Sequence, residues 1–133
     1  MTTAYKELPN EQTEWFDCLW SDIAHGSGYW LKSIEFGHFV DNANDTDDQV
    51  KIVPDTAAIG DYKWLMPSFY IFGKDFILRA VEKHADWFID HKRPYFQRAG
   101  ECMKEGNFAS LDYDADVTDC LLQLALWGDV IFG

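Results

Sequence analysis

Apolar side chains recur at helical spacing in three stretches of the sequence. They return every three or four positions over Glu11–Ala24, over Phe76–Asp90 and over Val117–Trp127. Gly128 follows the last stretch, where a glycine commonly ends a helix. A further helix is expected to begin at Pro94, because proline suits the first turn. The pattern therefore predicts three to four helices.

Between these stretches, short runs rich in aromatic and β-branched residues predict strands. We expect strands over Tyr29–Val40, Val50–Val53, Tyr62–Met66 and Phe69–Phe72, and a short edge strand over Asp129–Phe132. Strands and helices do not alternate regularly, which favours the α+β class over a doubly wound fold. The sequence predicts a small antiparallel sheet packed with these helices.

The length of 133 residues suits a single core. We expect residues 1–10 to be a flexible N-terminal tail and residues 11–133 to form one acidic α+β domain. The three cysteines lie far apart, which is typical of reduced thiols. The first residues lack the apolar core of a secretion signal, and no apolar run approaches the length of a membrane span. These features predict a protein of the cytoplasm with no membrane partner.

The formal net charge of −12 is distributed unevenly. Residues 1–62 carry twelve acidic and three basic side chains, residues 63–104 five acidic and eight basic, and residues 105–133 six acidic and none basic. If the two acidic segments share a face, the molecule presents a broad negative field. Direct binding of nucleic acid is then disfavoured, because phosphates would meet carboxylates. The alternative is that the charge only keeps the protein soluble.

The densest group of carboxylates is Asp112, Asp114, Asp116 and Asp119. Its start resembles a calcium-binding loop, but that loop requires Gly at its sixth position and Glu at its twelfth. Val117 and Gln123 occupy those positions here. Acidic residues just before a helix also cap its free N–H groups and complement its dipole. We therefore interpret this group as helix capping.

No other pattern indicates a metal, a cofactor or a catalytic group. The loop that carries Asp41, Asp45, Asp47 and Asp48 is interpreted as solvated, with metal binding or imitation of phosphates as the alternatives. The four histidines show no metal-ligand spacing, and no nucleotide-binding or nucleophile motif occurs. The basic residues of the central segment are expected to pair with the acidic remainder. We expect no cofactor and no enzymatic activity.

Two pieces of sequence resemble a known group of proteins. Near the C-terminus stand the run from Asp112 to Asp116, then Asp119-Cys120, Gln123 and Trp127-Gly128-Asp129-Val130-Ile131-Phe132-Gly133, and Gly28-Tyr29-Trp30 precedes the first expected strand. This pattern is similar to that of small uncharacterised acidic proteins encoded by phages, prophages and mobile elements. It covers about a quarter of the chain, and Trp127 stands where phenylalanine is usual in the group. The resemblance implies a genetic setting and no activity.

The acidic charge and this setting together suggest a non-enzymatic inhibitor of a host nucleic-acid-handling defence system, of the anti-CRISPR or anti-restriction type. Its partner would be a host protein with a basic nucleic-acid-binding surface, and the acidic surface would compete with nucleic acid. One alternative is a structural or assembly protein of a phage, held by its many aromatic residues. A less favoured alternative is a small metal-dependent enzyme using His84, Asp86, Asp90 and His91. The residues expected to bind the partner are Asp41, Asp45, Asp47, Asp48, Asp112, Asp114 and Asp116.

Overall fold

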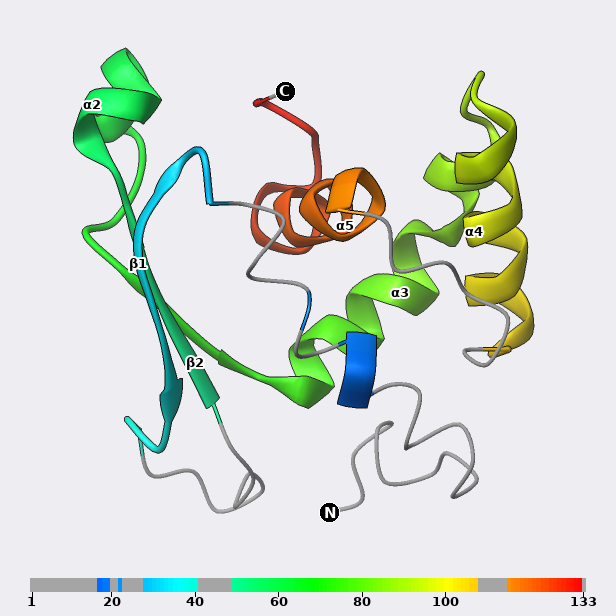
Figure 1. Cartoon of the computed structure of the whole chain (residues 1–133), viewed down its shortest axis with the longest axis horizontal. Helices are drawn as coiled ribbons and strands as arrows, with labels where there is room; N and C mark the ends of the chain where they lie inside the picture. The colour runs from blue at the N-terminus through cyan, green and yellow to red at the C-terminus, as the bar shows by residue number, and fades with distance from the viewer. Residues whose placement is uncertain (1–16, 20–21, 23–27, 41–48, 108–114, 133) are drawn as a thin grey trace.

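A three-stranded antiparallel sheet forms one side of the molecule and a group of helices forms the other (Figure 1). The computed structural model describes residues 17–19, 22, 28–40, 49–107 and 115–132. The strands are β1 (Leu31–Gly37), β2 (Gln49–Pro54) and β3 (Tyr70–Gly73), and β2 lies in the middle of the sheet. The fold is α+β and forms one domain, as the sequence predicts.

The strand register gives the sheet an apolar inner face. Ile34 lies opposite Ile52 and Phe36 lies opposite Val50, which in turn pairs with Phe72 of β3. Because side chains alternate between the two faces of a strand, these residues share one face. Val50 and Ile52 are fully buried. The middle strand therefore carries the sheet's contribution to the core.

The helices pack in two groups. α3 (Lys74–Ile89) and α4 (Pro94–Glu105) lie against each other, and α5 (Ala115–Trp127) runs between them and the sheet (Figure 1). A short helix α2 (Thr56–Ile59) continues into a 3-10 helix η3 (Gly60–Trp64) at the far end of β2. The central helix is thus covered on both sides, which places its residues in the core.

The close crossing of α3 and α4 depends on Gly100. A Cβ atom at this position would lie 2.6 Å from the backbone nitrogen of Ile89 and 2.8 Å from the carbonyl oxygen of Ala85. Both contacts are shorter than side chains tolerate, so only glycine lets the two backbones approach this closely. Phe88 of α3 and Phe96 of α4 also meet between the two helices, with ring centroids 5.8 Å apart.

Most of the predicted elements are confirmed within the described residues, but two predicted strands are wrong. Tyr62–Met66 contains the end of a 3-10 helix, and Asp129–Phe132 forms no strand. The predicted tail of residues 1–10 and most of the helix expected over Glu11–Ala24 lie outside the described residues. None of the helices that the structure describes is both long and apolar enough to cross a membrane.

Candidate functional site

Asp116 is the one residue of the predicted partner-binding set that the structure describes. It lies in the first turn of α5 with an exposed side chain, and its Oδ2 atom is 3.9 Å from Nη1 of Arg93. The hydroxyl group of Tyr95 also donates to this carboxylate over 3.3 Å. The other six residues of the set lie outside the described residues: Asp41, Asp45, Asp47, Asp48, Asp112 and Asp114. Whether the seven share a face stays a prediction.

Four basic residues of the central segment pair with carboxylates. Lys74 and Arg93 pair with the acidic remainder of the chain, as the sequence predicts, whereas the partners of Arg79 and Lys104 belong to the central segment itself. The pairs are Lys74–Asp17, Arg79–Asp75, Arg93–Asp116 and Lys104–Asp86, with distances of 3.0, 3.1, 3.9 and 3.0 Å. Asp86, one of the residues of the metal-enzyme alternative, is therefore engaged with a lysine. Among the described residues, no three His, Cys, Asp or Glu side chains are grouped so that they could hold a metal ion.

The most concentrated polar arrangement in the described core surrounds Asp119. Its side chain is 6% exposed on the buried side of α5. Oδ1 accepts from the indole Nε1 of Trp30 at 2.9 Å, and Oδ2 accepts from the hydroxyl group of Tyr29 at 2.5 Å and from Nε2 of Gln123 at 3.1 Å. A buried carboxylate requires such donors, because desolvation without them costs several kcal/mol or more. Asp119 is therefore not the helix cap that its neighbourhood in the sequence suggested.

Gln123 lies one turn further along α5 and holds the C-terminal residues. Its Oε1 atom accepts from the backbone N–H groups of Ile131 and Phe132, both at 2.8 Å, and its Nε2 atom donates to the carbonyl oxygen of Phe132 at 3.1 Å. The side chain has no exposed surface. One glutamine thus supplies the partners that a neighbouring strand would otherwise give to this backbone.

We call these four side chains, Tyr29, Trp30, Asp119 and Gln123, the Asp119 network. Burial of the Tyr29 hydroxyl group raises the pKa of the phenol well above its ordinary value, and the adjacent Asp119 carboxylate raises it further. Half of the Tyr29 side chain is exposed, but its hydroxyl group reaches the buried carboxylate. The phenol therefore stays protonated and keeps donating. This arrangement joins the start of β1 and the C-terminal residues to the central helix.

An aromatic cluster surrounds the Asp119 network. Trp30 contacts Trp127 and Phe132, with ring centroids 5.1 and 5.8 Å apart. The Trp127 indole donates to the hydroxyl group of Tyr70 at 3.0 Å. Phe132 also contacts the ring of Tyr62 edge-on, with ring centroids 5.4 Å apart. The C-terminal residues are thus packed between the central helix and η3.

Large apolar side chains are exposed on η3 and on the segment that leads to β3. Trp64 and Leu65 are 79% and 80% exposed, and Tyr62 and Phe69 are 42% and 47% exposed. We call Tyr62, Trp64, Leu65 and Phe69 the η3 surface. The strand predicted for this segment would have buried alternate residues, so the sequence did not indicate this exposure. Exposed apolar groups of this size often mark interaction sites.

Comparison of the chain with protein-family models, with curated proteins and with solved structures gave no match. The resemblance to phage and mobile-element proteins therefore stays a prediction. Residues that carry it lie together in the fold, since Tyr29, Trp30, Asp119, Gln123 and Trp127 all belong to the Asp119 network or to the aromatic cluster around it. In the sequence, the signal for this network is the pair Asp119 and Gln123, two polar residues four positions apart in a largely apolar helix.

Proposed function

We propose that this protein is a non-enzymatic binding protein that attaches to another protein through the η3 surface. The observation that carries the proposal is the exposure of Trp64 and Leu65, at consecutive positions and about four-fifths accessible. Aromatic side chains such as Trp and Tyr provide much of the binding energy in protein interfaces when they enter a pocket of the partner. Exposing them to water is unfavourable in a protein that has no partner.

The excess of acidic side chains favours a partner with a basic surface. The chain carries 23 acidic and 11 basic side chains, and such an excess favours association with a basic surface and slows association with an acidic one. We therefore propose that the partner is a host protein with a basic nucleic-acid-binding surface. Occupation of that surface would inhibit the partner by competition with nucleic acid. The seven aspartates predicted from the sequence would contribute to this competition in the cytoplasm of the host.

The experiment compares capture of host proteins by the immobilised wild-type chain and by two variants. One carries Trp64→Ser with Leu65→Ser, and the other replaces the seven aspartates with asparagine. Phe39→Ser is the matched control for the first variant, because Phe39 is an exposed ring outside the η3 surface, two residues after the end of β1. Neutralisation of the exposed Glu82, Asp90, Glu101 and Glu105 is the control for the second.

Capture is measured at about 0.1 M and about 1 M salt, between which the screening length falls from about 10 Å to about 3 Å. We expect both variants to lose a protein that the wild type and both controls retain, and we expect high salt and added nucleic acid to release it. Retention of the same proteins by all five chains, or no effect of nucleic acid, would contradict the proposal.

A second candidate function is assembly into a larger phage structure, and the same exposed rings favour it. Contacts made by apolar rings depend little on ionic strength, unlike contacts between charges. If the η3 surface joins copies of this chain, light scattering should show self-association at both salt concentrations. Trp64→Ser with Leu65→Ser should then give a monomer. A wild type that is monomeric throughout contradicts self-assembly and leaves binding to a different protein.

A further inference from the structure

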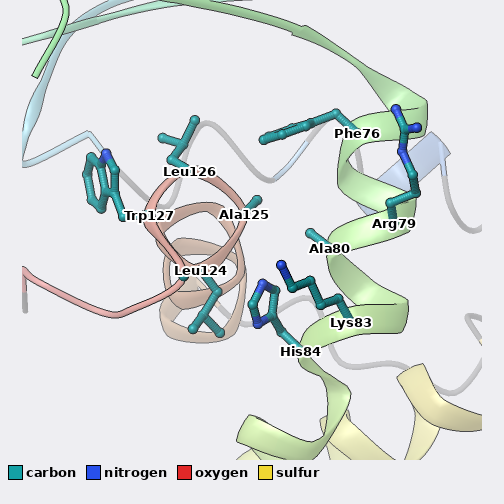
Figure 2. A pocket seen from close by; sticks show the side chains of 10 residues that line it. Phe76, Arg79, Ala80, Lys83, His84, Leu124, Ala125, Leu126 and Trp127 are labelled. Carbon is teal, nitrogen blue, oxygen red and sulfur yellow. The ribbon is translucent and has the colours of Figure 1, made fainter.

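A groove with a volume of about 420 Å³ lies between α3 and the last turn of α5 (Figure 2). Phe76 and Ala80 contribute apolar surface from α3, and Leu124 and Leu126 contribute it from α5. Figure 2 shows the Phe76 ring extending from α3 towards Leu126. The volume lies within the range of about 300–1,000 Å³ that small-molecule sites occupy. The groove is separate from the η3 surface, so an inference about it goes beyond the proposed function.

The α3 side of the groove is basic, although the protein as a whole is strongly acidic. Arg79, Lys83 and His84 line it, and residues 79 and 83 lie one turn apart on the same side of the helix. Arg79 is engaged with Asp75 at 3.1 Å. Lys83 forms no ion pair with any residue that the structure describes. Figure 2 shows its ammonium group beside the His84 ring, directed towards α5.

His84 adds a polar group without adding charge. Partial burial lowers the pKa of its imidazole below the ordinary value, and the nearby Lys83 charge lowers it further. At neutral pH the ring is therefore uncharged and offers one N–H donor and one acceptor. The positive charge of the groove is thus concentrated at Lys83, with Arg79 further along the same side.

We propose that this groove binds a small amphipathic carboxylate, with its apolar body between Phe76 and Leu126 and its charged end at Lys83. Charge complementarity supports this class of ligand. The groove combines apolar side chains with Arg79, Lys83 and His84, and small-molecule sites likewise place a few polar groups among apolar surface. An ammonium group beside such a cavity favours an anion over a neutral or cationic molecule of the same shape.

Three ligands that share one apolar body separate charge recognition from apolar binding. They are phenylbutyrate, its neutral amide and phenylbutylamine, each titrated calorimetrically into the full chain. We expect saturable binding of phenylbutyrate, binding of the amide weaker by about two- to fivefold because the ion pair with the exposed Lys83 ammonium group is lost, and no binding of the amine. Equal binding of the acid and the amide would overturn the proposal, as would a lack of saturable binding of phenylbutyrate.

Two variants locate the site. Lys83→Gln should weaken phenylbutyrate binding by about two- to fivefold while leaving the affinity for the amide nearly unchanged. Lys92→Gln makes the same chemical change at an exposed lysine outside the groove and should leave both affinities unchanged. Equal weakening by the two substitutions would indicate a general effect of net charge and would contradict the assignment.

Ala125→Phe tests the cavity itself, because it adds a ring to the α5 side of the groove without altering any charge. We expect it to abolish binding of the acid and of the amide. Far-ultraviolet circular dichroism and thermal unfolding establish whether the variant is folded. If Ala125→Phe fails to fold, Ala125→Leu makes a smaller addition at the same place. A folded variant with wild-type affinity for phenylbutyrate would place the ligand elsewhere.

Discussion

Replacement of Asp119 by leucine should destabilise the protein far more than the same replacement of Asp116, three residues earlier in the same helix. Leucine has the same number and branching of side-chain heavy atoms as aspartate, but it is bulkier and accepts no hydrogen bond. The substitution leaves the indole N–H of Trp30 without an acceptor. Trp30 is only 1% exposed, so water does not replace the lost acceptor. Gln123 keeps the Phe132 carbonyl oxygen as an acceptor, and the half-exposed Tyr29 can turn its hydroxyl group to water.

The magnitude follows from these three donors. One sealed donor without a partner costs about 1–3 kcal/mol, and each hydrogen bond lost by a donor that finds another partner costs about 0.5–1.5 kcal/mol. We therefore expect Asp119→Leu to lower the free energy of unfolding by about 2–6 kcal/mol, a large part of the roughly 5–15 kcal/mol that stabilises a domain. Asp116 is exposed and its ion pair spans 3.9 Å, so its replacement should cost at most about 1 kcal/mol.

The assay is urea unfolding followed by far-ultraviolet circular dichroism, so that changes at Trp30 do not alter the signal. A double-mutant cycle with Trp30→Phe then isolates the bond between the indole and the carboxylate. Removing both partners leaves no buried donor unpaired, so the double variant should be more stable than the sum of the single effects predicts. If Asp119→Leu and Asp116→Leu differ by less than about 0.5 kcal/mol, the usual range of surface substitutions, the network does not stabilise the fold as argued.

Three further predictions concern other parts of the molecule. Gly100→Ala should lower the free energy of unfolding by about 1–3 kcal/mol through overpacking, because its Cβ would lie 2.6 Å from a backbone nitrogen of α3. Glu101→Ala, at the next and exposed position, should change the free energy of unfolding little. Equal effects of the two substitutions would contradict the close crossing of α3 and α4. Burial, and to a smaller extent the Asp119 carboxylate, raises the pKa of the Cys120 thiol to about 11. Iodoacetamide at mildly alkaline pH should therefore modify Cys120 more slowly than the exposed Cys18, as followed by mass spectrometry. Equal rates of modification would contradict this prediction. Burial lowers the pKa of His84 in the native protein, so His84 takes up a proton at a higher pH in the unfolded chain than in the native one. The free energy of unfolding should therefore fall as the pH drops below about 6.5. In urea unfolding measured at several pH values, His84→Gln should reduce this dependence on pH.

Periodicity predicted the regular elements because their burial follows from local spacing. α3 turns its apolar stripe to the core, and Gly128, which has a φ of 72°, follows the last turn of α5 as expected. The segment Tyr62–Met66 was mispredicted because its composition suits a strand. Asp55 caps the preceding helix α2 by accepting from the N–H group of Ala57, and the backbone continues into η3. Local capping thus decided the structure where composition was misleading.

The Asp119 network was beyond local sequence reasoning for a different reason. Its two halves lie about ninety residues apart, since Trp30 and Tyr29 precede β1 and Asp119 lies in α5. The sequence places Asp119 among the acidic residues before it, but its position in the second turn of α5 directs its side chain to the core rather than to the helix end. The strand expected at the C-terminus failed because Gln123 provides the partners for that backbone. Only the tertiary arrangement shows which polar side chains are buried together.

The network also supports the surface proposed to bind a partner. A short 3-10 helix such as η3 has poor hydrogen-bond geometry and does not hold its shape alone. Here the ring of Tyr62 rests edge-on against Phe132, and the backbone of Phe132 is fixed by Gln123, which also donates to Asp119. A chain of contacts therefore leads from the buried carboxylate to the helix that exposes Trp64. A binding surface on so short an element needs a rigid support, and the C-terminal residues supply it from the core.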